Sequence, residues 1–283
     1  MNKELKKVMI EDVEYSFDPE KEYIKDGHAY CKVCHERKDG KALEFFGKQM
    51  IFKTDCKCDR DREAKEKERQ KQLEIERLKS ICFTSIIQCA YTFENYQGKE
   101  NQSFIIAKNF VKDYEQMRKE NIGLLFYGSV GSGKTYLACS IANALIEQYQ
   151  ISVKIRNFSQ IINELQKGGF DLDKNAYIES LVNTSVLILD DLGIERDTSY
   201  AKEQVYNIVN NRYLKHKPTI FTTNLSYSQI ENCTESVEYQ RIYSRIIEMC
   251  IPVMVLGEDY RKVIQEEKLK RNKERLLTGG ERI

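Results

Sequence analysis

Residues 123–135 read GLLFYGSVGSGKT, an apolar run that passes directly into a glycine-rich loop. The loop, Gly128 to Thr135, matches the pattern G-x-x-x-x-G-K-[ST]. We predict a strand over residues 123–127 and a helix over residues 134–148, the context in which this pattern binds phosphate. The glycines let successive backbone N–H groups point at phosphate oxygens, and the N-terminus of the helix adds partial positive charge. The stretch therefore predicts a nucleotide site between a strand and a helix.

The polar side chains of this loop have distinct expected roles. We expect Lys134 to reach the β- and γ-phosphates and Thr135 to be a ligand of Mg²⁺. The predicted nucleotide-binding residues, completed by one residue of a later strand, are Gly128, Ser129, Val130, Gly131, Ser132, Gly133, Lys134, Thr135, Tyr136 and Asp190. A chance match in a glycine-containing loop is the alternative, and the flanking strand and helix argue against it.

A second apolar run ends in two acids, VLILDD at residues 186–191. A buried parallel strand delivers the residues at its carboxyl end to the crevice where ligands bind. We expect Asp190 to hold Mg²⁺, directly or through water, and Asp191 to act as general base toward the attacking water. Asp is one methylene shorter than the Glu that often fills the second role, and ordinary turn chemistry at a strand end is the alternative.

Apolar strand-like runs alternate with helical stretches from about residue 80 onward. Further strands are predicted over residues 152–156, 219–223 and 252–256. Further helices are predicted over residues 158–165, 176–182, 200–216, 239–249 and 260–273. Strands that alternate with helices build a parallel sheet covered on both faces. We therefore predict an α/β fold with a parallel five-stranded sheet flanked by helices.

Four residues beyond the second acid could complete a catalytic site. Asn224 closes the strand that ends TTN and could orient the lytic water, although Asn also commonly begins a turn. Arg241 and Arg245 are spaced i, i+4 and share one face of a helix, from which one could reach a neighbouring subunit as an arginine finger. Arg261 opens the last predicted helix. For each of the three arginines, the alternative is a solvated side chain without a catalytic role.

Four of the nine cysteines lie close together near the N-terminus. They form a Cys31-x-x-Cys34 pair and a Cys56-x-Cys58 pair, and four thiolates are the ligand set of a structural zinc ion. His35 is a competing ligand and His28 a weaker one. A redox pair would leave the second pair without a use, and free thiols are the other alternative. A segment with little apolar sequence of its own needs such a staple.

Composition sets the outer limits of the interpretation. The net charge of +1 predicts neither nucleic-acid nor membrane binding, although a local basic patch could exist. No apolar run is long enough to span a membrane, and the charged N-terminus is not a signal peptide. We therefore expect a cytoplasmic location, with the five scattered cysteines in the core. Residues 59–79 carry dense charge of mixed sign and are predicted to form an exposed linker helix.

Several motifs in a fixed order resemble those of one family. They are YTFENY (91–96), the phosphate loop, VLILDDLG (186–193), TTN (222–224), RIYSRI (241–246) and DYR (259–261). In this combination, residues 85–265 resemble bacterial and phage helicase loaders of the DnaC/DnaI type, within the AAA+ class of ATPases. IstB transposition ATPases are similar.

The resemblance implies roles for single residues and for partners. It implies that Asn224 is the first sensor, Arg245 the trans arginine finger with Arg241 beside it, and Arg261 the second sensor. The stretch from Phe93 to Tyr96 would lie near the adenine. It also implies ATP binding, self-assembly through the arginine finger, single-stranded DNA binding, and a hexameric replicative helicase engaged by an N-terminal domain that carries zinc in some members.

The sequence thus predicts a zinc-binding, helicase-interacting domain (1–58), a charged helical linker (59–80) and an AAA+ ATPase domain (81–283). The expected function is ATP-dependent delivery of the helicase to single-stranded DNA, with weak ATP hydrolysis by the isolated chain. A transposition helper ATPase and a nucleotide-gated adaptor with little hydrolysis remain as alternatives. Basic residues toward the C-terminus could contact DNA or form a solvated helix end; they are Lys262, Lys268, Lys270, Arg271, Lys273 and Arg275.

Overall fold

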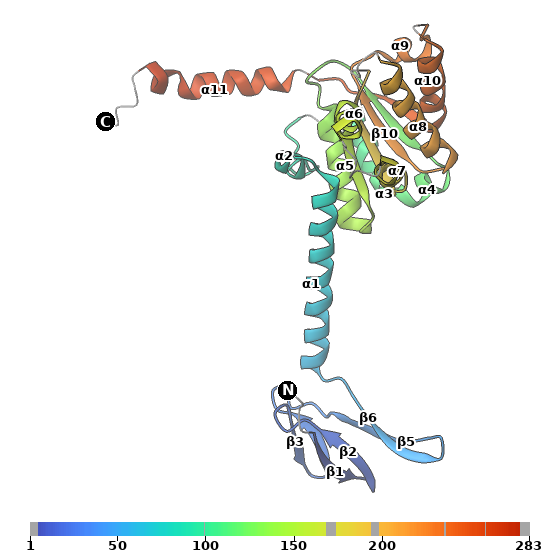
Figure 1. The fold of residues 1–283 in the computed structure, drawn as a ribbon. Helices are drawn as coiled ribbons and strands as arrows, with labels where there is room; N and C mark the ends of the chain where they lie inside the picture. The colour runs from blue at the N-terminus through green and yellow to red at the C-terminus, as the bar shows by residue number, and fades with distance from the viewer. Residues whose placement is uncertain are drawn as a thin grey trace. The chain divides into compact units, whose positions relative to one another are not determined.

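The computed structural model describes residues 5–98, 100–167, 174–193, 198–234, 236–257 and 259–277 (Figure 1). The chain divides into two compact units, Met1–Leu73 and Glu74–Ile283. The charged stretch predicted to be helical forms α1 (Lys57–Cys82), and the division between the units falls within this helix. In the described residues, no helix combines the length and the apolar character needed to cross a membrane.

The N-terminal unit contains three antiparallel hairpins that the sequence reading did not foresee. They pair β1 (Lys6–Ile10) with β2 (Val13–Phe17), β3 (Glu22–Lys25) with β4 (His28–Cys31), and β5 (Asp39–Phe45) with β6 (Lys48–Lys53). Each hairpin turns through two residues with positive φ, the backbone that fits the right-handed twist of paired strands. The core is small: Ile10, Tyr15 and Ala29 are buried within it.

The second unit is built on a sheet of five parallel strands, as predicted. The strands are β7 (Gly123–Tyr127), β8 (Val153–Asn157), β9 (Val186–Leu192), β10 (Thr219–Thr223) and β11 (Cys250–Met254). Their order across the sheet is β11-β7-β10-β9-β8, and every neighbouring pair is parallel. The carboxyl ends of β7, β9 and β10 therefore meet at one edge, which places the phosphate loop beside the two acids.

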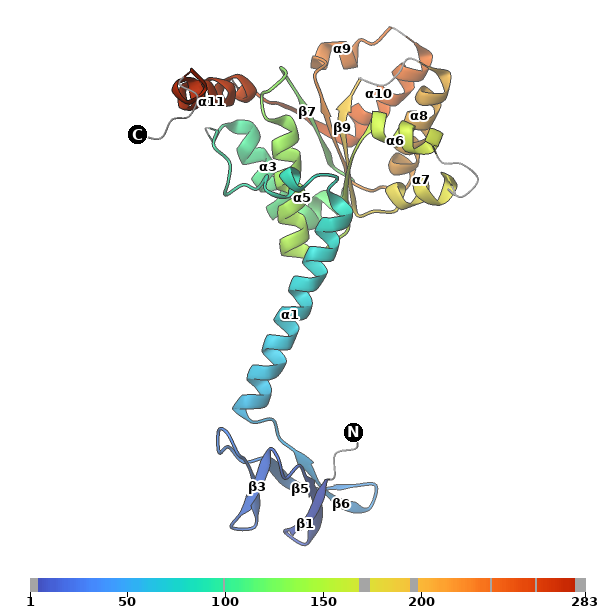
Figure 2. The ribbon, with the colours of Figure 1, turned by 60° about the vertical axis from the view of Figure 1, so that its left-hand side comes forward.

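Helices cover both faces of this sheet (Figure 2). One face packs against the C-terminal part of α1, α2 (Ile86–Cys89), α3 (Gln102–Lys112), α4 (Tyr114–Lys119) and α5 (Lys134–Tyr149). The other packs against α6 (Phe158–Lys167), α7 (Lys174–Val182), α8 (Ser199–Leu214), α9 (Tyr227–Glu231) and α10 (Val237–Met249). Alternate residues of each strand point to opposite faces, so Ile188 joins one core and Leu187 the other. The last helix is α11 (Tyr260–Leu277).

Candidate nucleotide site and cysteine centre

The phosphate loop leaves β7 and enters α5 through a backbone that only glycine adopts easily. Gly128, Gly131 and Gly133 have φ of 146°, 79° and 98°. A Cβ at Gly131 would stand 2.0 Å from a carboxylate oxygen of Asp259, and the amide of Tyr260 donates to the Gly131 carbonyl at 3.3 Å. The start of α11 therefore lies against the loop, and this close approach requires glycine.

Two side chains of the loop, Ser132 and Lys134, have polar groups that could bind an anion. The hydroxyl of Ser132 is buried and finds no hydrogen-bond partner among the described residues. The amino group of Lys134 is turned back onto the loop and donates to the carbonyls of Gly128, at 3.0 Å, and Ser129, at 2.7 Å. Burial lowers the pKa of Lys134, while Asp191 and Asp190 act in the opposite direction. A phosphate would supply partners for both side chains, so the loop fits the group that its sequence predicts.

The first acid of β9 is held by two hydroxyl groups. Thr135 at the start of α5 donates to Asp190 Oδ1 at 2.9 Å, and Thr222 of β10 donates to the same oxygen at 2.6 Å. Burial raises the pKa of Asp190, against the effect of these hydrogen bonds. A hydroxyl and a carboxylate held together supply the hard oxygen ligands that Mg²⁺ takes, so the pair fits that ion.

The second acid lies at an irregularity of the sheet. The pairing of β10 with β9 shifts by one residue, because Phe221 pairs with Leu189 and Thr223 with Leu192. Asp190 and Asp191 together therefore lie opposite the single residue Thr222, an arrangement called a β-bulge. Asp191 has a φ of 59°. The backbone N–H of Asp191 donates to Thr222 Oγ1 at 3.0 Å. One buried hydroxyl thus fixes the positions of both acids.

Sequence reasoning missed Thr222 and a second neighbour of Asp191. Asn157, the last residue of β8, donates to Asp191 Oδ2 at 3.4 Å. The signal in the sequence is the pattern TTN at residues 222–224, whose third residue, Asn224, is the one predicted to be functional. Asn224 is exposed directly after β10, and the threonine two residues before it makes the contacts with the acids. Only the strand order reveals which residue of TTN faces the doubled acid.

An aromatic group lies beside the phosphate loop, on the side of α3. Tyr136, the third residue of α5, stacks on Tyr91 with ring centroids 4.6 Å apart, and its hydroxyl donates to the Thr92 carbonyl. Tyr96 lies 5.4 Å from the Tyr136 ring and stacks on Phe104 at 4.8 Å. The segment expected near the adenine therefore offers flat apolar surfaces next to the phosphate loop.

The candidate arginines occupy two different places. Arg245 on α10 lies over the rings of Tyr206 and Tyr213 of α8, and its guanidinium donates to the Tyr206 hydroxyl at 3.2 Å. Arg241, one turn earlier, is exposed and lines a hollow of about 290 Å³ between α8 and α10. By contrast, Arg261 directly follows Asp259 and Tyr260, and both of these residues lie against Gly131 of the phosphate loop. The structure thus brings Arg261 to the loop and leaves the α10 pair on a surface of their own.

The four clustered cysteines come together as the sequence predicts. One sulfur atom from each of Cys31, Cys34, Cys56 and Cys58 lies within 4.8 Å of every other. A backbone hydrogen bond from Glu36 lowers the pKa of Cys34 to about 6, whereas burial raises the pKa of Cys56 to about 12. A divalent cation would supply the charge that keeps all four as thiolates, so the set fits zinc.

The competing histidines are engaged elsewhere. His35 Nδ1 lies 3.2 Å from the hydroxyl of Tyr23, and His28 Nδ1 lies 2.9 Å from the buried carboxylate of Asp39. The ligand set offered by the described residues is therefore the four cysteines.

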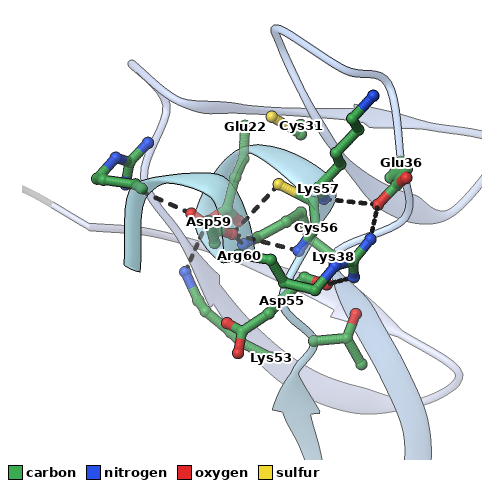
Figure 3. Close-up of polar contacts among 12 residues, drawn as sticks. Glu22, Cys31, Glu36, Lys38, Lys53, Asp55, Cys56, Lys57, Asp59 and Arg60 are labelled. Atoms are coloured by element: carbon green, nitrogen blue, oxygen red, sulfur yellow. Dashed lines mark hydrogen bonds and ion pairs between the residues drawn. The ribbon is translucent and has the colours of Figure 1, made fainter. Parts of the chain in front are cut away.

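A lysine–carboxylate pair lies against the cysteines (Figure 3). Asp59 accepts hydrogen bonds from the Cys56 thiol, at 3.2 Å, and from the Cys56 amide, at 3.3 Å. The ammonium of Lys38 binds the same carboxylate oxygen and lowers the pKa of Asp59 to about 2. Lys38 thereby balances negative charge that would otherwise lie next to the sulfur atoms.

Comparisons with known proteins agree with this geometry. Residues 58–268 match the family model described as IstB-like ATP binding protein. The chain is 34% identical over 162 residues to the phage-like element PBSX protein XkdC of Bacillus subtilis (strain 168), covering 54% of this chain and 58% of that protein. It is 30% identical over 162 residues to the replicative helicase loader DnaI of the same strain, covering 54% and 51%. The chain thus spans about half the length of the curated relatives it matches.

A solved structure extends the likeness to the fold. The crystal structure of the DnaC helicase loader matches with a TM-score of 0.54 at 28% identity, over 61% of this chain and 100% of that chain. This match confirms the predicted AAA+ architecture of the five-stranded unit. The family match begins at residue 58, so three of the four clustered cysteines lie outside it.

Proposed function

The chain belongs to the family of IstB-like ATP-binding proteins, and within it we propose an ATP-dependent loader that delivers a hexameric replicative helicase to single-stranded DNA. The observation that carries the hydrolytic part is the doubled acid on a bulge beside the phosphate loop. The similar proteins named as replicative helicase loaders support the partner.

The proposed binding site uses side chains that already lie together. Residues Gly128–Thr135 would wrap the phosphates, and Lys134 would exchange its two loop carbonyls for phosphate oxygens. Tyr136 would border the base from α5. Thr135 and Asp190 would hold Mg²⁺. When bound, Mg²⁺ supplies positive charge that neutralises the phosphate oxygens.

The proposed hydrolysis depends on groups at the strand ends. Asp191 would take a proton from the attacking water, and Asn224 would orient that water. Arg261 would act from the same chain as second sensor, and Arg245, with Arg241 beside it, from the next protomer as arginine finger. Because a finger in trans completes the site only in an assembly, the isolated chain would hydrolyse ATP weakly.

The proposed cofactors are ATP, Mg²⁺ and zinc, with zinc held by Cys31, Cys34, Cys56 and Cys58. The N-terminal unit, which would engage the helicase, has a small core. The zinc ion would therefore stabilise this unit by holding the ends of its hairpins together.

Binding to the helicase tests the proposal. The full chain is titrated into fluorescently labelled replicative helicase from the cell that carries its gene, with and without ATP. We expect binding that depends on ATP and fails in a Lys134→Ala variant, because the ammonium group that would hold the phosphates is lost. Absence of binding under every nucleotide condition would reject the loader function and leave the nucleotide site standing.

A transposition helper is the second candidate, and the family match itself favours it. It would bind duplex DNA together with a transposase and would not bind the helicase.

An adaptor that barely hydrolyses ATP is a further alternative, and the Asp191→Asn variant distinguishes it. If the chain is such an adaptor, this variant would load the helicase as well as the wild type does.

A further inference from the structure

The β5–β6 hairpin presents one face that the described residues of its own unit leave exposed. Antiparallel partners point their side chains to the same face, and the register pairs Leu43 with Met50 and Phe45 with Lys48. Ile51, of the opposite face, packs against the buried residues of the N-terminal unit. The residues of the outward face are all exposed; with the turn residue they are Lys41, Leu43, Phe45, Phe46, Lys48, Met50 and Phe52. We call this set the hairpin face.

The turn of this hairpin holds a phenylalanine where small or polar residues fit better. Phe46 and Gly47 have φ of 49° and 73°, the two-residue turn that favours Asn-Gly. A bulky side chain at positive φ is costly, and the other two hairpins use Glu11-Asp12 and Asp26-Gly27 instead. The Phe46 side chain is nevertheless 93% exposed. The unfavourable backbone conformation of Phe46 is thus not offset by burial of its side chain in the core of this unit.

The aromatic rings of the hairpin face form a joined apolar surface. Phe45 lies edge-on to Phe46, with centroids 4.6 Å apart, and edge-on to Phe52 at 6.3 Å. Such a cluster at the surface of a single small unit marks an interaction site. Phenylalanine and methionine are also enriched in the buried centres of protein interfaces.

Charge narrows the chemistry of the occupant. Lys41 and Lys48 are the charged residues of the hairpin face, which carries no acid, and Glu44 points to the opposite face. Two lysines are few for a nucleic-acid surface. The three phenylalanine rings could stack on bases, but they pack edge-on against one another and lie beside the aliphatic Leu43 and Met50, so the face as a whole is an apolar surface more than a row of stacking platforms. The face therefore complements an apolar protein segment flanked by carboxylates.

We infer that the hairpin face docks an amphipathic, acid-flanked segment of the replicative helicase. This inference rests on the proposed loader function and assigns the partner contact to one surface. Apolar side chains of the helicase segment would cover Phe45, Phe46 and Phe52, and its carboxylates would meet Lys41 and Lys48.

The substitution Phe46→Asn separates binding from folding. Asn is favoured at this turn position, so the hairpin should keep or gain stability while the exposed ring is lost. The full chain is titrated into labelled replicative helicase of its own cell with ATP, and thermal unfolding is followed by circular dichroism. We expect affinity to fall on the order of ten-fold, with an unfolding temperature no lower than that of the wild type. Lys48→Glu should also weaken binding, most strongly at low salt.

The matched control is Met9→Thr, which removes an exposed apolar side chain from β1 of the same unit. It should bind like the wild type. If the wild type binds and Phe46→Asn binds equally well, the hairpin face is not the docking surface and the loader function stands. If Phe46→Asn loses single-stranded DNA binding and keeps the helicase, the occupant is nucleic acid and the inference is wrong. If the wild type does not bind the helicase, the loader function fails and this inference fails with it.

Discussion

At the scale of single residues, the bulge at the end of β9 depends on the hydroxyl of Thr222. That hydroxyl donates to Asp190 and accepts from the amide of Asp191, whose φ is positive. In a regular strand, two consecutive acids would point to opposite faces of the sheet. The bulge changes this alternation, so Thr222 acts as a positioning residue for both acids.

A Thr222→Val variant should therefore hydrolyse ATP about ten- to hundred-fold more slowly, because Asp191 loses the contact that fixes its backbone. Nucleotide affinity, measured with a fluorescent ATP analogue, should change much less, since Lys134 and the loop remain. The variant should also be less stable by about 1–3 kcal/mol, because the buried carboxylate of Asp190 loses a donor and the amide of Asp191 loses its acceptor.

Thr222→Ser is the control, because it keeps the hydroxyl and removes one methyl group. It should restore most of the rate. Wild-type turnover in Thr222→Val, with the protein folded, would show that the hydroxyl does not position Asp191.

At the scale of elements, the cysteine centre joins β4, the loop after it and the start of α1. Cys31 ends β4, Cys34 follows it, and Cys58 is the second residue of α1. A metal ion held by these sulfurs would fix where α1 begins. The small core of the hairpins makes the N-terminal unit dependent on such a staple.

Metal analysis of the purified full chain should find about one zinc ion per molecule. Cys56→Ser should lose it, because a buried ligand is removed, whereas His35→Ala should retain it, because His35 bonds to Tyr23. A strong chelator should melt the N-terminal unit and leave ATP binding by the second unit intact. Zinc loss from His35→Ala, or retention by Cys56→Ser, would overturn the four-cysteine assignment.

The sequence predicted the elements of the second unit better than those of the first. The strands and helices around the phosphate loop are long and strongly apolar on one or both faces, so their type followed from periodicity. The three N-terminal hairpins are short, and the first turns through Glu11-Asp12, which carries no glycine signal. Asp26-Gly27 and Phe46-Gly47 do carry a glycine, but the strands that flank them are too short and too polar for their alternation to mark them. Thr222 escaped notice because a sequence does not give strand order, and the bulge depends on how β10 pairs with β9.

At the scale of the whole molecule, the proposed arginine finger requires contact between protomers. Arg245 lies on the rings of Tyr206 and Tyr213 within its own chain, and Arg241 is exposed beside a hollow. The α8–α10 surface is thus where a second copy's nucleotide site would be placed.

Mixing two inactive variants tests this arrangement. Each variant alone should hydrolyse ATP more slowly than the wild type. For Arg245→Ala the rate should fall by a factor of about 10³ where the arginine finger limits hydrolysis, and Lys134→Ala should also be slow. A mixture should recover part of the rate, because an intact Lys134 site can meet an intact Arg245 from the other variant. No recovery in mixtures that do assemble would place the arginine's role within its own chain.

The most direct test of the loader function is transfer of the helicase to closed circular single-stranded DNA. Helicase from the cell that carries the gene is mixed with the circle, ATP and the full chain, and helicase bound to DNA is measured after gel filtration. We predict that the wild type places the helicase on the circle in an ATP-dependent way, and that Lys134→Ala does not. Helicase bound equally with and without the chain, or with Lys134→Ala in its place, would contradict the proposed function.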